Sequence, residues 1–242
     1  MKFKDHYAYK QKRNVFHGRS LDPIFVIGDV HGCADEFRIL CEQIKSYSQY
    51  SLIIQAGDLI DRGPYFKEVF DVVREFNVEL ILGNHELNFL LEHRSFKKCN
   101  SKARAESHER FALLNEDEQE SILSIMDQSF NNVSVHIDDK TYIISHSPIK
   151  QFEYNQNTVE LNAWDCCSRN EPYSVDMNGT NFIGVHGHQH WNYTPIQDQI
   201  ESNNSFINID GGCVYGNELV AYELMSKTAF IVKANQIYCT SR

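Results

Sequence analysis

The 242-residue chain lacks the cysteine patterns of a zinc ribbon and of a disulfide framework. Its seven cysteines are an odd number, and no two of them form a C-x-x-C pair. No run of about eighteen apolar residues is present, so we expect no membrane span. The basic N-terminus also lacks the apolar stretch of a signal peptide. These absences make the reducing cytoplasm the simplest expected location.

Positive charge is in deficit. The chain has 23 Lys and Arg residues and 33 Asp and Glu residues, which gives a formal net charge of −10. Nucleic acids and anionic membranes attract an excess of Lys and Arg, so we expect neither as a partner. A hydrophobic content of 42% can fill a sizeable core. We therefore expect a basic N-terminal arm over residues 1–22 and one domain over residues 23–242.

Strand and helix patterns alternate in the first third of the chain. The apolar run IFVIG at 24–28 is typical of a buried strand, and a helical pattern follows at 34–44. The same pair recurs as a strand at 51–58 and a helix after Pro64, and a third strand is expected at 78–84. Such alternation predicts βαβ units with ligand sites at the carboxyl ends of the strands.

The second half of the chain follows a different pattern. Residues from about 92 to 132 are polar with a short amphipathic stripe, and we expect a helical insertion there. Six later apolar runs predict a second sheet with antiparallel pairs. These runs are VSVHI, TYIIS, NFIGV, FINI, LVAYEL and TAFIVKA.

Polar side chains follow each of the three early strands, in GDVHG, GDLIDRGP and GNHE. A single Gly-Asp after a strand is usually just a turn. Here, however, IISHSP and GVHGHQHWN add histidines at two further strand ends. A set of Asp, Asn and His without thiolates suits manganese, iron or zinc. The set is too large for one ion, and two ions about 3.5 to 4 Å apart that share a carboxylate are typical of phosphoesterases.

These motifs, together with NIDGGCVYG, resemble the calcineurin-like metallophosphoesterases over residues 28–216. The nearest branch is the phosphoprotein phosphatase type, which includes the bacteriophage lambda-type protein phosphatases and the symmetrical diadenosine tetraphosphate hydrolases. The resemblance implies an α/β fold, a four-layer α/β/β/α sandwich of two mixed β-sheets with a helical insertion. It also implies two divalent metal ions, for which we expect Mn²⁺, with iron or zinc as alternatives.

The resemblance also implies the metal ligands. Asp29 and His31 would bind the first ion, and Asp58 would bridge both. The second ion would take Asn84, His146 and His188.

Further roles concern catalysis and substrate binding. The resemblance makes His85 the proton donor to the leaving group, with Asp61 orienting it. Arg62 and Asn84 would bind the phosphate. Independently of the resemblance, histidine is the side chain best tuned for proton transfer near neutral pH, and the arginine fork suits two phosphate oxygens.

The chain departs from the branch at two of the histidine motifs, and no intact motif locates a second phosphate-binding arginine. His146 precedes Ser-Pro where Ala-Gly is usual, which puts the loop geometry in question. GHQH replaces Gly-His-Thr, so His190 is a candidate additional ligand of the first ion, whereas His186 is expected to be structural. Arg169, after AWDCCS, is the candidate for a second phosphate-binding arginine.

We therefore expect an enzyme, a metal-dependent phosphatase. The first expectation is a serine/threonine, or tyrosine, protein phosphatase in which a hydroxide bridging the two metals attacks phosphorus. The alternative is a symmetrical bis(5'-nucleosyl)-tetraphosphate hydrolase, so the partner is a phosphorylated protein or a small phosphoester. A rival of another class is a non-catalytic regulatory or binding module that retains the fold, but it predicts loss of ligand positions, and all six core positions are present.

Overall fold

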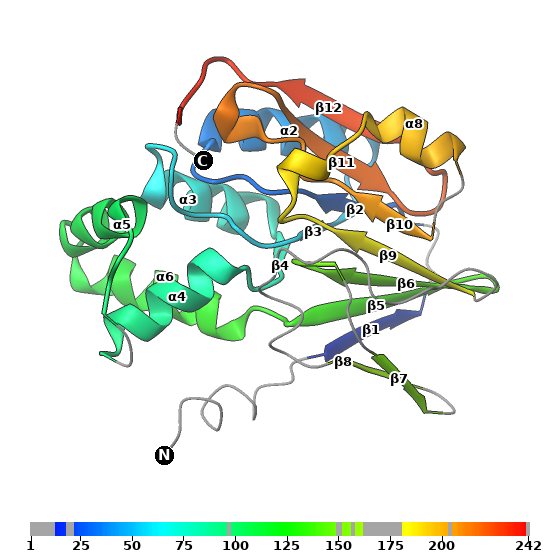
Figure 1. Cartoon of the computed structure of the whole chain (residues 1–242), viewed down its shortest axis with the longest axis horizontal. Coiled ribbons are helices and arrows are strands. Elements are labelled where there is room, and N and C mark those ends of the chain that lie inside the picture. The colour runs from blue at the N-terminus through cyan, green and yellow to red at the C-terminus, as the bar shows by residue number, and fades with distance from the viewer. Residues whose placement is uncertain are drawn as a thin grey trace.

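The structure is a computed structural model of the chain and describes residues 13–17, 22–95, 98–148, 152–155, 158–161, 181–202 and 205–240. Two five-stranded mixed sheets pack face to face, and helices cover the outer face of one of them (Figure 1). The two mixed sheets with helices confirm the α/β fold that the sequence predicts. Arg169 and residues 1–12 of the expected N-terminal arm lie outside the described residues.

The first sheet has the strand order β12-β11-β2-β3-β4. Its parallel strands β2 (Ile24–Ile27), β3 (Leu52–Gln55) and β4 (Glu79–Leu80) are those expected from the early alternation. The connecting helices α2 (Ala34–Tyr47) and α3 (Phe66–Phe76) complete the βαβ units. Strand β4 is shorter than the predicted run 78–84, since Ile81 forms only an isolated bridge with Phe130 and helix α4 (Asn84–His93) begins at Asn84.

The expectation that the last two strands join the second sheet is wrong. Strand β11 (Glu218–Glu223) pairs antiparallel with β2, and β12 (Ala229–Lys233) pairs with β11, so both extend the first sheet. Leu219 faces the helices while its neighbour Val220 faces the other sheet. Because β11 is buried on both faces, its apolar pattern does not reveal the sheet to which it belongs.

The second sheet has the order β1-β5-β6-β9-β10. Strands β5 (Asn132–Ile137) and β6 (Lys140–Ser145) form an antiparallel pair, while β9 (Phe182–His186) and β10 (Phe206–Asn208) are added in parallel. Strand β1 (Arg13–His17), from the predicted arm, pairs in parallel with β5.

The remaining elements lie around the two sheets. The predicted helical insertion contains α5 (Lys102–Ala112) and α6 (Glu116–Gln128), which gather with the preceding helix α4 (Asn84–His93) at one end of the sandwich (Figure 1). Helix α8 contacts β10 on the second sheet. The other elements are α8 (Ile196–Glu201), the hairpin β7 (Phe152–Asn155) and β8 (Thr158–Leu161), and the 3-10 turns η1 (His190–Asn192) and η2 (Cys213–Tyr215).

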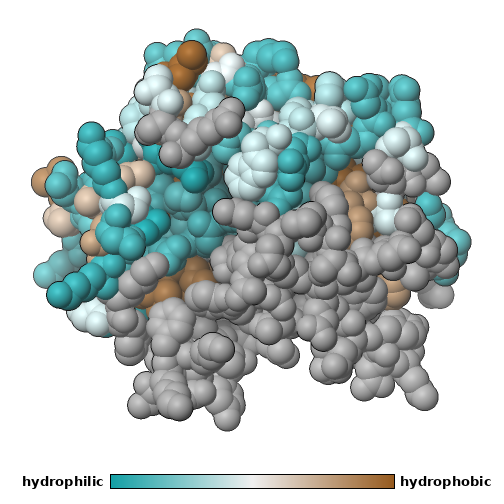
Figure 2. Space-filling model, in the orientation of Figure 1, coloured by the Kyte–Doolittle hydropathy of each residue, from teal (hydrophilic) through white to brown (hydrophobic). Residues whose placement is uncertain are grey.

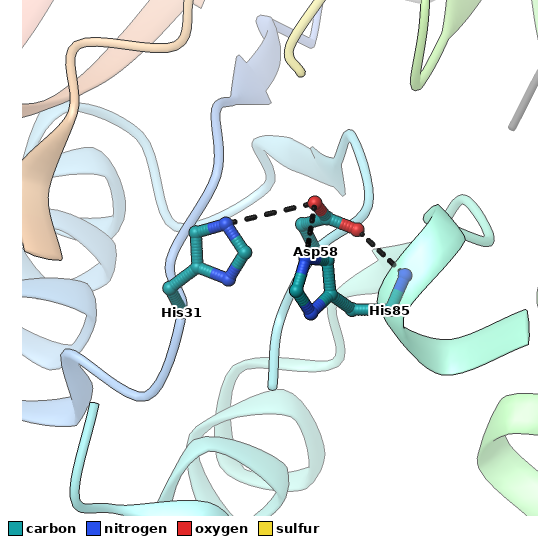
Figure 3. A group of neighbouring side chains, drawn as sticks. All are labelled: His31, Asp58 and His85. Carbon is teal, nitrogen blue, oxygen red and sulfur yellow. Dashed lines mark hydrogen bonds and ion pairs between the residues drawn. The ribbon is translucent and has the colours of Figure 1, made fainter. Parts of the chain in front are cut away.

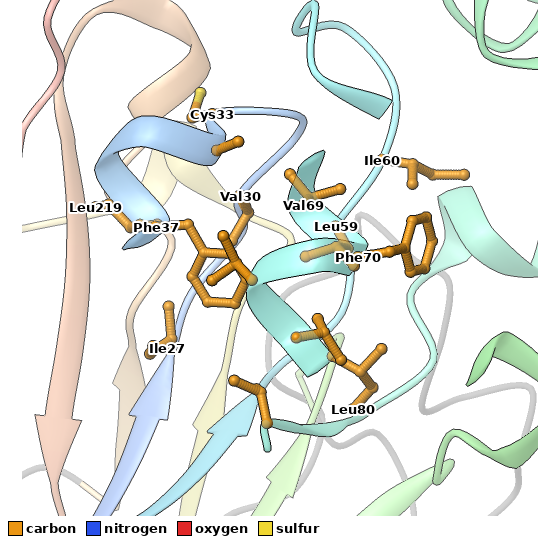
Figure 4. Packing of buried hydrophobic residues seen from close by; sticks show 14 of the residues in the cluster. Ile27, Val30, Cys33, Phe37, Leu59, Ile60, Val69, Phe70, Leu80 and Leu219 are labelled. Carbon is orange, nitrogen blue, oxygen red and sulfur yellow. The ribbon is translucent and has the colours of Figure 1, made fainter. Parts of the chain in front are cut away.

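Two layers of apolar side chains hold the sandwich together. On β2, Phe25 and Ile27 face the helices, and Val26 faces the second sheet, as the two-residue period of a strand requires. The helix-side layer includes Phe37 of α2 and Phe70 of α3 (Figure 4). Each such buried side chain contributes roughly 1.5 to 3 kcal/mol. The carboxyl ends of the strands are therefore fixed by a rigid core.

The surface contrasts with this core. Where the drawn face shows described residues, they are mainly hydrophilic, and the hydrophobic ones are scattered in small areas (Figure 2). Among the described residues, no helix combines the length and the apolar character needed to cross a bilayer.

Candidate metal and catalytic site

Asp58, directly after strand β3, lies at the centre of the predicted site. Its Oδ2 is 3.5 Å from His31 Nε2 and 3.7 Å from His85 Nε2, and its Oδ1 accepts a 3.0 Å hydrogen bond from the His85 backbone N–H (Figure 3). Its Oδ1 also lies 3.3 Å from His146 Nε2. Asp58 is therefore shared by two groups of potential ligands, namely His31, Asp58 and His85, and Asp58, His146 and His188.

His31 directs its Nε2 toward Asp58. Its Nδ1 donates to the Ile60 carbonyl at 2.9 Å, which leaves Nε2 as the unprotonated nitrogen of a neutral ring. Burial, and then the positive charge of Arg62, hold the pKa of His31 well below its usual range. Arg62 contacts the same Nε2 and lies 5.9 Å from the centre of the Tyr215 ring. A metal ligand needs such a neutral ring with a fixed tautomer.

The second group shows the same arrangement. His146 Nδ1 pairs with the Ala56 carbonyl at 3.0 Å, so Nε2 faces the other donors. His146 Nε2 lies 3.0 Å from Asn84 Oδ1 and 3.0 Å from His188 Nδ1. Burial, followed by the charge of His146, lowers the pKa of His188 to about 3.

Asp58 is ionised despite its burial. Burial alone would raise its pKa, but His146 and His85 together hold the pKa well below its usual range. The Nε2 atoms of His31 and His146 around one carboxylate, with an amide oxygen beside them, form a donor set that suits a borderline divalent ion. The residues present therefore fit the dinuclear metal centre.

Asp29 links the ends of the two sheets. Its Oδ1 and Oδ2 accept from the His188 backbone N–H at 3.1 and 3.2 Å, and its Oδ2 is 3.8 Å from His31 Nε2. A Cβ at Gly187 would lie 2.0 Å from Asp29 Oδ1, so this position accepts no side chain. Burial, and then Asp210 and Asp58, raise the pKa of Asp29 well above its usual range. Such crowded carboxylates are stabilised by cations.

His85 and Asp61 form a hydrogen-bonded pair. His85 Nδ1 donates to Asp61 Oδ2 at 2.6 Å, and both side chains are buried. The bond turns His85 Nε2 toward Asp58, at the 3.7 Å given above. This geometry is the one that the predicted proton donor and its orienting carboxylate require.

Several side chains of the site stand on a left-handed backbone. Positive φ angles occur at five predicted site residues, namely His31 at 47°, Asp58 at 58°, Asp61 at 71°, Arg62 at 70° and His188 at 69°. For residues other than glycine, this conformation costs on the order of 1 to 3 kcal/mol. The turns that project these side chains are therefore strained and must be held by other contacts.

Glu86 supplies such contacts, and the sequence reasoning missed it. Its carboxylate accepts hydrogen bonds from the backbone N–H groups of Asp58 at 2.9 Å, Leu59 at 2.9 Å and Ile60 at 3.1 Å. It also accepts from the Gly83 N–H at 3.0 Å. Burial, and then Asp58, raise its pKa to about 7. The motif GNHE contains this glutamate, but the motif alone does not indicate that its carboxylate binds the backbone of the loop after β3.

Three other positions complete the comparison with the sequence. Within the described part of the chain, neither ligand group includes His190, whose ring lies against Tyr215 with the centroids 4.4 Å apart. Asp210, in NIDGG, is buried beside Asp29, and burial raises its pKa to about 6. The sequence reasoning quoted this motif without naming Asp210. The candidate Arg169 lies outside the described residues.

Comparisons with known proteins agree with this geometry. A family model described as calcineurin-like phosphoesterase matches residues 22–228. The chain is 27% identical to an asymmetrical bis(5'-nucleosyl)-tetraphosphatase from Oceanobacillus iheyensis, over 90% of this chain and 95% of that protein. It is 35% identical to a symmetrical bis(5'-nucleosyl)-tetraphosphatase from Buchnera aphidicola subsp. Acyrthosiphon pisum, over 54% of this chain and 46% of that protein. The match to the second relative thus spans less than half of its length.

Solved structures share the fold at low sequence identity. The crystal structure of a candidate diadenosine tetraphosphatase aligns with a TM-score of 0.64 at 17% identity, over 91% of this chain and 98% of that one. A serine/threonine protein phosphatase from Saccharomyces cerevisiae aligns with a TM-score of 0.50 at 11% identity, over 96% of this chain and 86% of that one. Both likenesses concern the fold alone.

Proposed function

The chain belongs to the calcineurin-like phosphoesterase family, and on that premise we propose that it hydrolyses dinucleoside tetraphosphates. Family membership makes it a phosphoester hydrolase, and the proposal concerns its substrate and the roles of its residues. The observation that carries the proposal is the sharing of Asp58 between two groups of ligand atoms. Asp29, His31 and Asp58 would hold one ion, and Asp58, with the amide and imidazole donors of the second group, would hold the other.

The protein groups have distinct tasks in this proposal. Bound metal ions would activate water and offset the negative charge of the phosphates. Arg62 offers two N–H groups to phosphate oxygens, once it turns away from His31 Nε2. His85, oriented by Asp61, delivers a proton to the leaving oxygen through Nε2. We propose manganese as the ion, with iron or zinc as alternatives.

The first expectation from the sequence, a protein phosphatase, is less well supported than its alternative. The relative that matches over 95% of its own length is named as a tetraphosphatase, as are the shorter matches. That relative is named as an asymmetrical tetraphosphatase, whereas the alternative expected from the sequence is a symmetrical tetraphosphate hydrolase. The proposal therefore covers both modes of cleavage, because the products distinguish them.

An exposed aromatic side chain supports a nucleotide substrate. Trp191 is 46% exposed, and its ring centroid lies 6.1 Å from that of His188 and 5.1 Å from that of His190. An exposed indole beside a proposed metal ligand, His188, offers a surface on which a nucleobase can stack, and such stacking contributes about 1 to 3 kcal/mol per base. A phosphorylated protein side chain brings no base to such a surface.

The test is hydrolysis of diadenosine tetraphosphate by the manganese-loaded protein. Symmetrical cleavage gives two ADP, and asymmetrical cleavage gives ATP and AMP. We expect kcat/KM for this substrate to exceed that for a phosphoserine peptide by at least about tenfold, with metal-stripped protein as the blank. Equal or faster hydrolysis of the peptide contradicts the proposed substrate class. Absence of hydrolysis with every substrate favours the non-catalytic binding module.

A variant tests the role of the indole. Trp191→Ala is expected to raise KM for diadenosine tetraphosphate by about tenfold, since one stacking contact is lost. The KM for p-nitrophenyl phosphate, which has no nucleobase, should stay unchanged. An equal rise for both substrates would show that Trp191 supports the site in general and does not select a nucleotide.

A further inference from the structure

Helix α5 of the insertion reaches the catalytic pair through Ser107. The Ser107 side chain is fully buried, and its Oγ donates to Asp61 Oδ1 at 2.5 Å. The same hydroxyl lies 3.3 Å from the Ala103 carbonyl, a much longer contact. A serine hydroxyl has one proton, and the shorter, charge-assisted bond to the carboxylate takes it.

Asp61 is therefore held at both oxygens. Its Oδ2 accepts from His85 Nδ1 at 2.6 Å while its Oδ1 accepts from Ser107. Hydrogen bonds run without a break from Ser107 through Asp61 to the ring of His85. These three residues come from α5, from the loop after β3 and from the first turn of α4.

A second bond ties α5 to the same loop. Arg110, one turn further along the helix, donates through Nη1 to the Gly63 carbonyl at 3.0 Å. Asp61 has a strained backbone with a φ of 71°, so contacts from elsewhere must hold this turn. The contacts from α5 supply the missing restraint.

We propose that Ser107 is a positioning residue that fixes Asp61, and through it the direction in which His85 delivers its proton. The proposal depends on the phosphoester hydrolase chemistry of the preceding section but not on the tetraphosphate as substrate. A carboxylate held at only one oxygen can rotate and move the imidazole of His85 out of line with the leaving group. The proposal therefore gives the helical insertion a role in catalysis. Proton transfer depends on such alignment.

The leaving group provides a specific test. A leaving group with a low pKa, such as 2,4-dinitrophenolate, departs without a proton, whereas phenolate needs one more strongly. Ser107→Ala is expected to lower kcat for phenyl phosphate on the order of tenfold and to leave kcat for 2,4-dinitrophenyl phosphate within about twofold. Alanine is the best helix former, so α5 should persist in this variant.

Matched variants separate this role from a structural one. Ser124→Ala removes an exposed hydroxyl of α6 that bonds to Gln128, and it should change neither rate. Ser107→Thr keeps the hydroxyl and should restore the rate with phenyl phosphate. His85→Asn should show the same dependence on the leaving group as Ser107→Ala, with a larger loss. Thermal unfolding and manganese titration of each variant verify the fold and the metal site.

Two results would overturn the proposal. One is an equal loss with both esters in Ser107→Ala, which indicates a general structural defect. The other is an unchanged rate with phenyl phosphate. Failure to cleave diadenosine tetraphosphate would refute the proposed substrate and leave this result standing, because the aryl esters alone decide the role of Ser107.

Discussion

At the scale of single residues, the residues that carry the proposed chemistry have left-handed backbone conformations that cost conformational free energy. His31, Asp58 and His188 all have positive φ, and glycine would relieve this strain but would supply no ligand. The turns persist because the side chains of His31 and Asp58 are buried and backbone N–H groups are bonded, as at Asp58 with Glu86 and at His188 with Asp29. The site thus depends on its surroundings for its shape.

One buried histidine makes stability depend on pH. His186 on β9 has Nδ1 against the Gly187 carbonyl, and burial lowers its pKa from 6.5 to about 4. Between these values the unfolded chain binds the extra proton, so the free energy of unfolding falls as pH decreases from 6.5 to 4. The contribution of this group is about 3 kcal/mol. Urea unfolding of the metal-free protein across this range measures it.

The control for this pH effect is His186→Asn, which cannot take up the proton. Its unfolding free energy should depend less steeply on pH than that of the parent chain between pH 6.5 and 4. Parallel pH profiles for the two proteins would show that His186 contributes nothing to the dependence.

The sequence identifies some of these residues and not others. Asp29 and Asp58 follow apolar strands directly, and this local position is enough to place them at the sheet edge. Asp210 follows the apolar run FINI in the same way, so the signal was present although the residue was not named. Ser107 lacks such a signal, since its role arises from a contact with Asp61 that the fold creates. A hydrogen bond between positions 46 residues apart leaves no trace in the spacing of either motif.

At the scale of elements, the start of helix α4 organises the loop after β3. Glu86 in its first turn accepts N–H groups from the three consecutive residues Asp58, Leu59 and Ile60. An amide in place of this carboxylate would turn its NH₂ group toward backbone donors. The helix therefore fixes the strained loop through one side chain.

Replacing this side chain is expected to weaken both the fold and the site. Glu86→Gln should lower the free energy of unfolding by about 2 kcal/mol, because backbone donors lose a charged acceptor while remaining buried. Manganese affinity should fall as well, since Asp58 loses its support. Chemical denaturation and isothermal titration measure the two effects.

The matched control is Glu75→Gln, at an exposed ion pair with Arg38. Such surface pairs contribute roughly 0 to 1 kcal/mol, and the substitution should leave manganese affinity unaltered. If Glu86→Gln changes the free energy of unfolding and the manganese affinity no more than this control does, then Glu86 does not hold the loop.

Prediction of the elements succeeded where patterns were local. The strands β2 and β3 and the helices α2 and α3 follow from apolar spacing alone. The sheet assignment of β11 and β12 did not, because pairing partners nearly 200 residues apart are chosen by packing on both faces, as Leu219 and Val220 illustrate.

At the scale of the whole molecule, the proposed ligands come from both sheets. Asp29, His31 and Asp58 follow strands of the first sheet, whereas His146 and His188 follow strands of the second. Ions bound to both sets would connect the two halves of the sandwich. Metal binding should therefore stabilise the entire fold and not one loop.

Addition of Mn²⁺ is expected to raise the free energy of unfolding by about 2.7 kcal/mol for each bound ion at one hundred times the dissociation constant. Thermal unfolding with and without a chelator measures the effect. Asp58→Asn, which weakens both groups of ligands, should remove most of the increase. An equal increase in this variant would place the ions elsewhere.

The antiparallel pairing of β2 with β11 governs the order of assembly during synthesis. Ala221 lies opposite Ile27, so the polar edge of β2 cannot be covered until residues 218–223 have left the ribosome. Until then the nascent chain exposes an apolar strand with unsatisfied N–H and C=O groups, a form prone to self-association. The first sheet therefore cannot close on the strand β2 side before residues 218–223 are available.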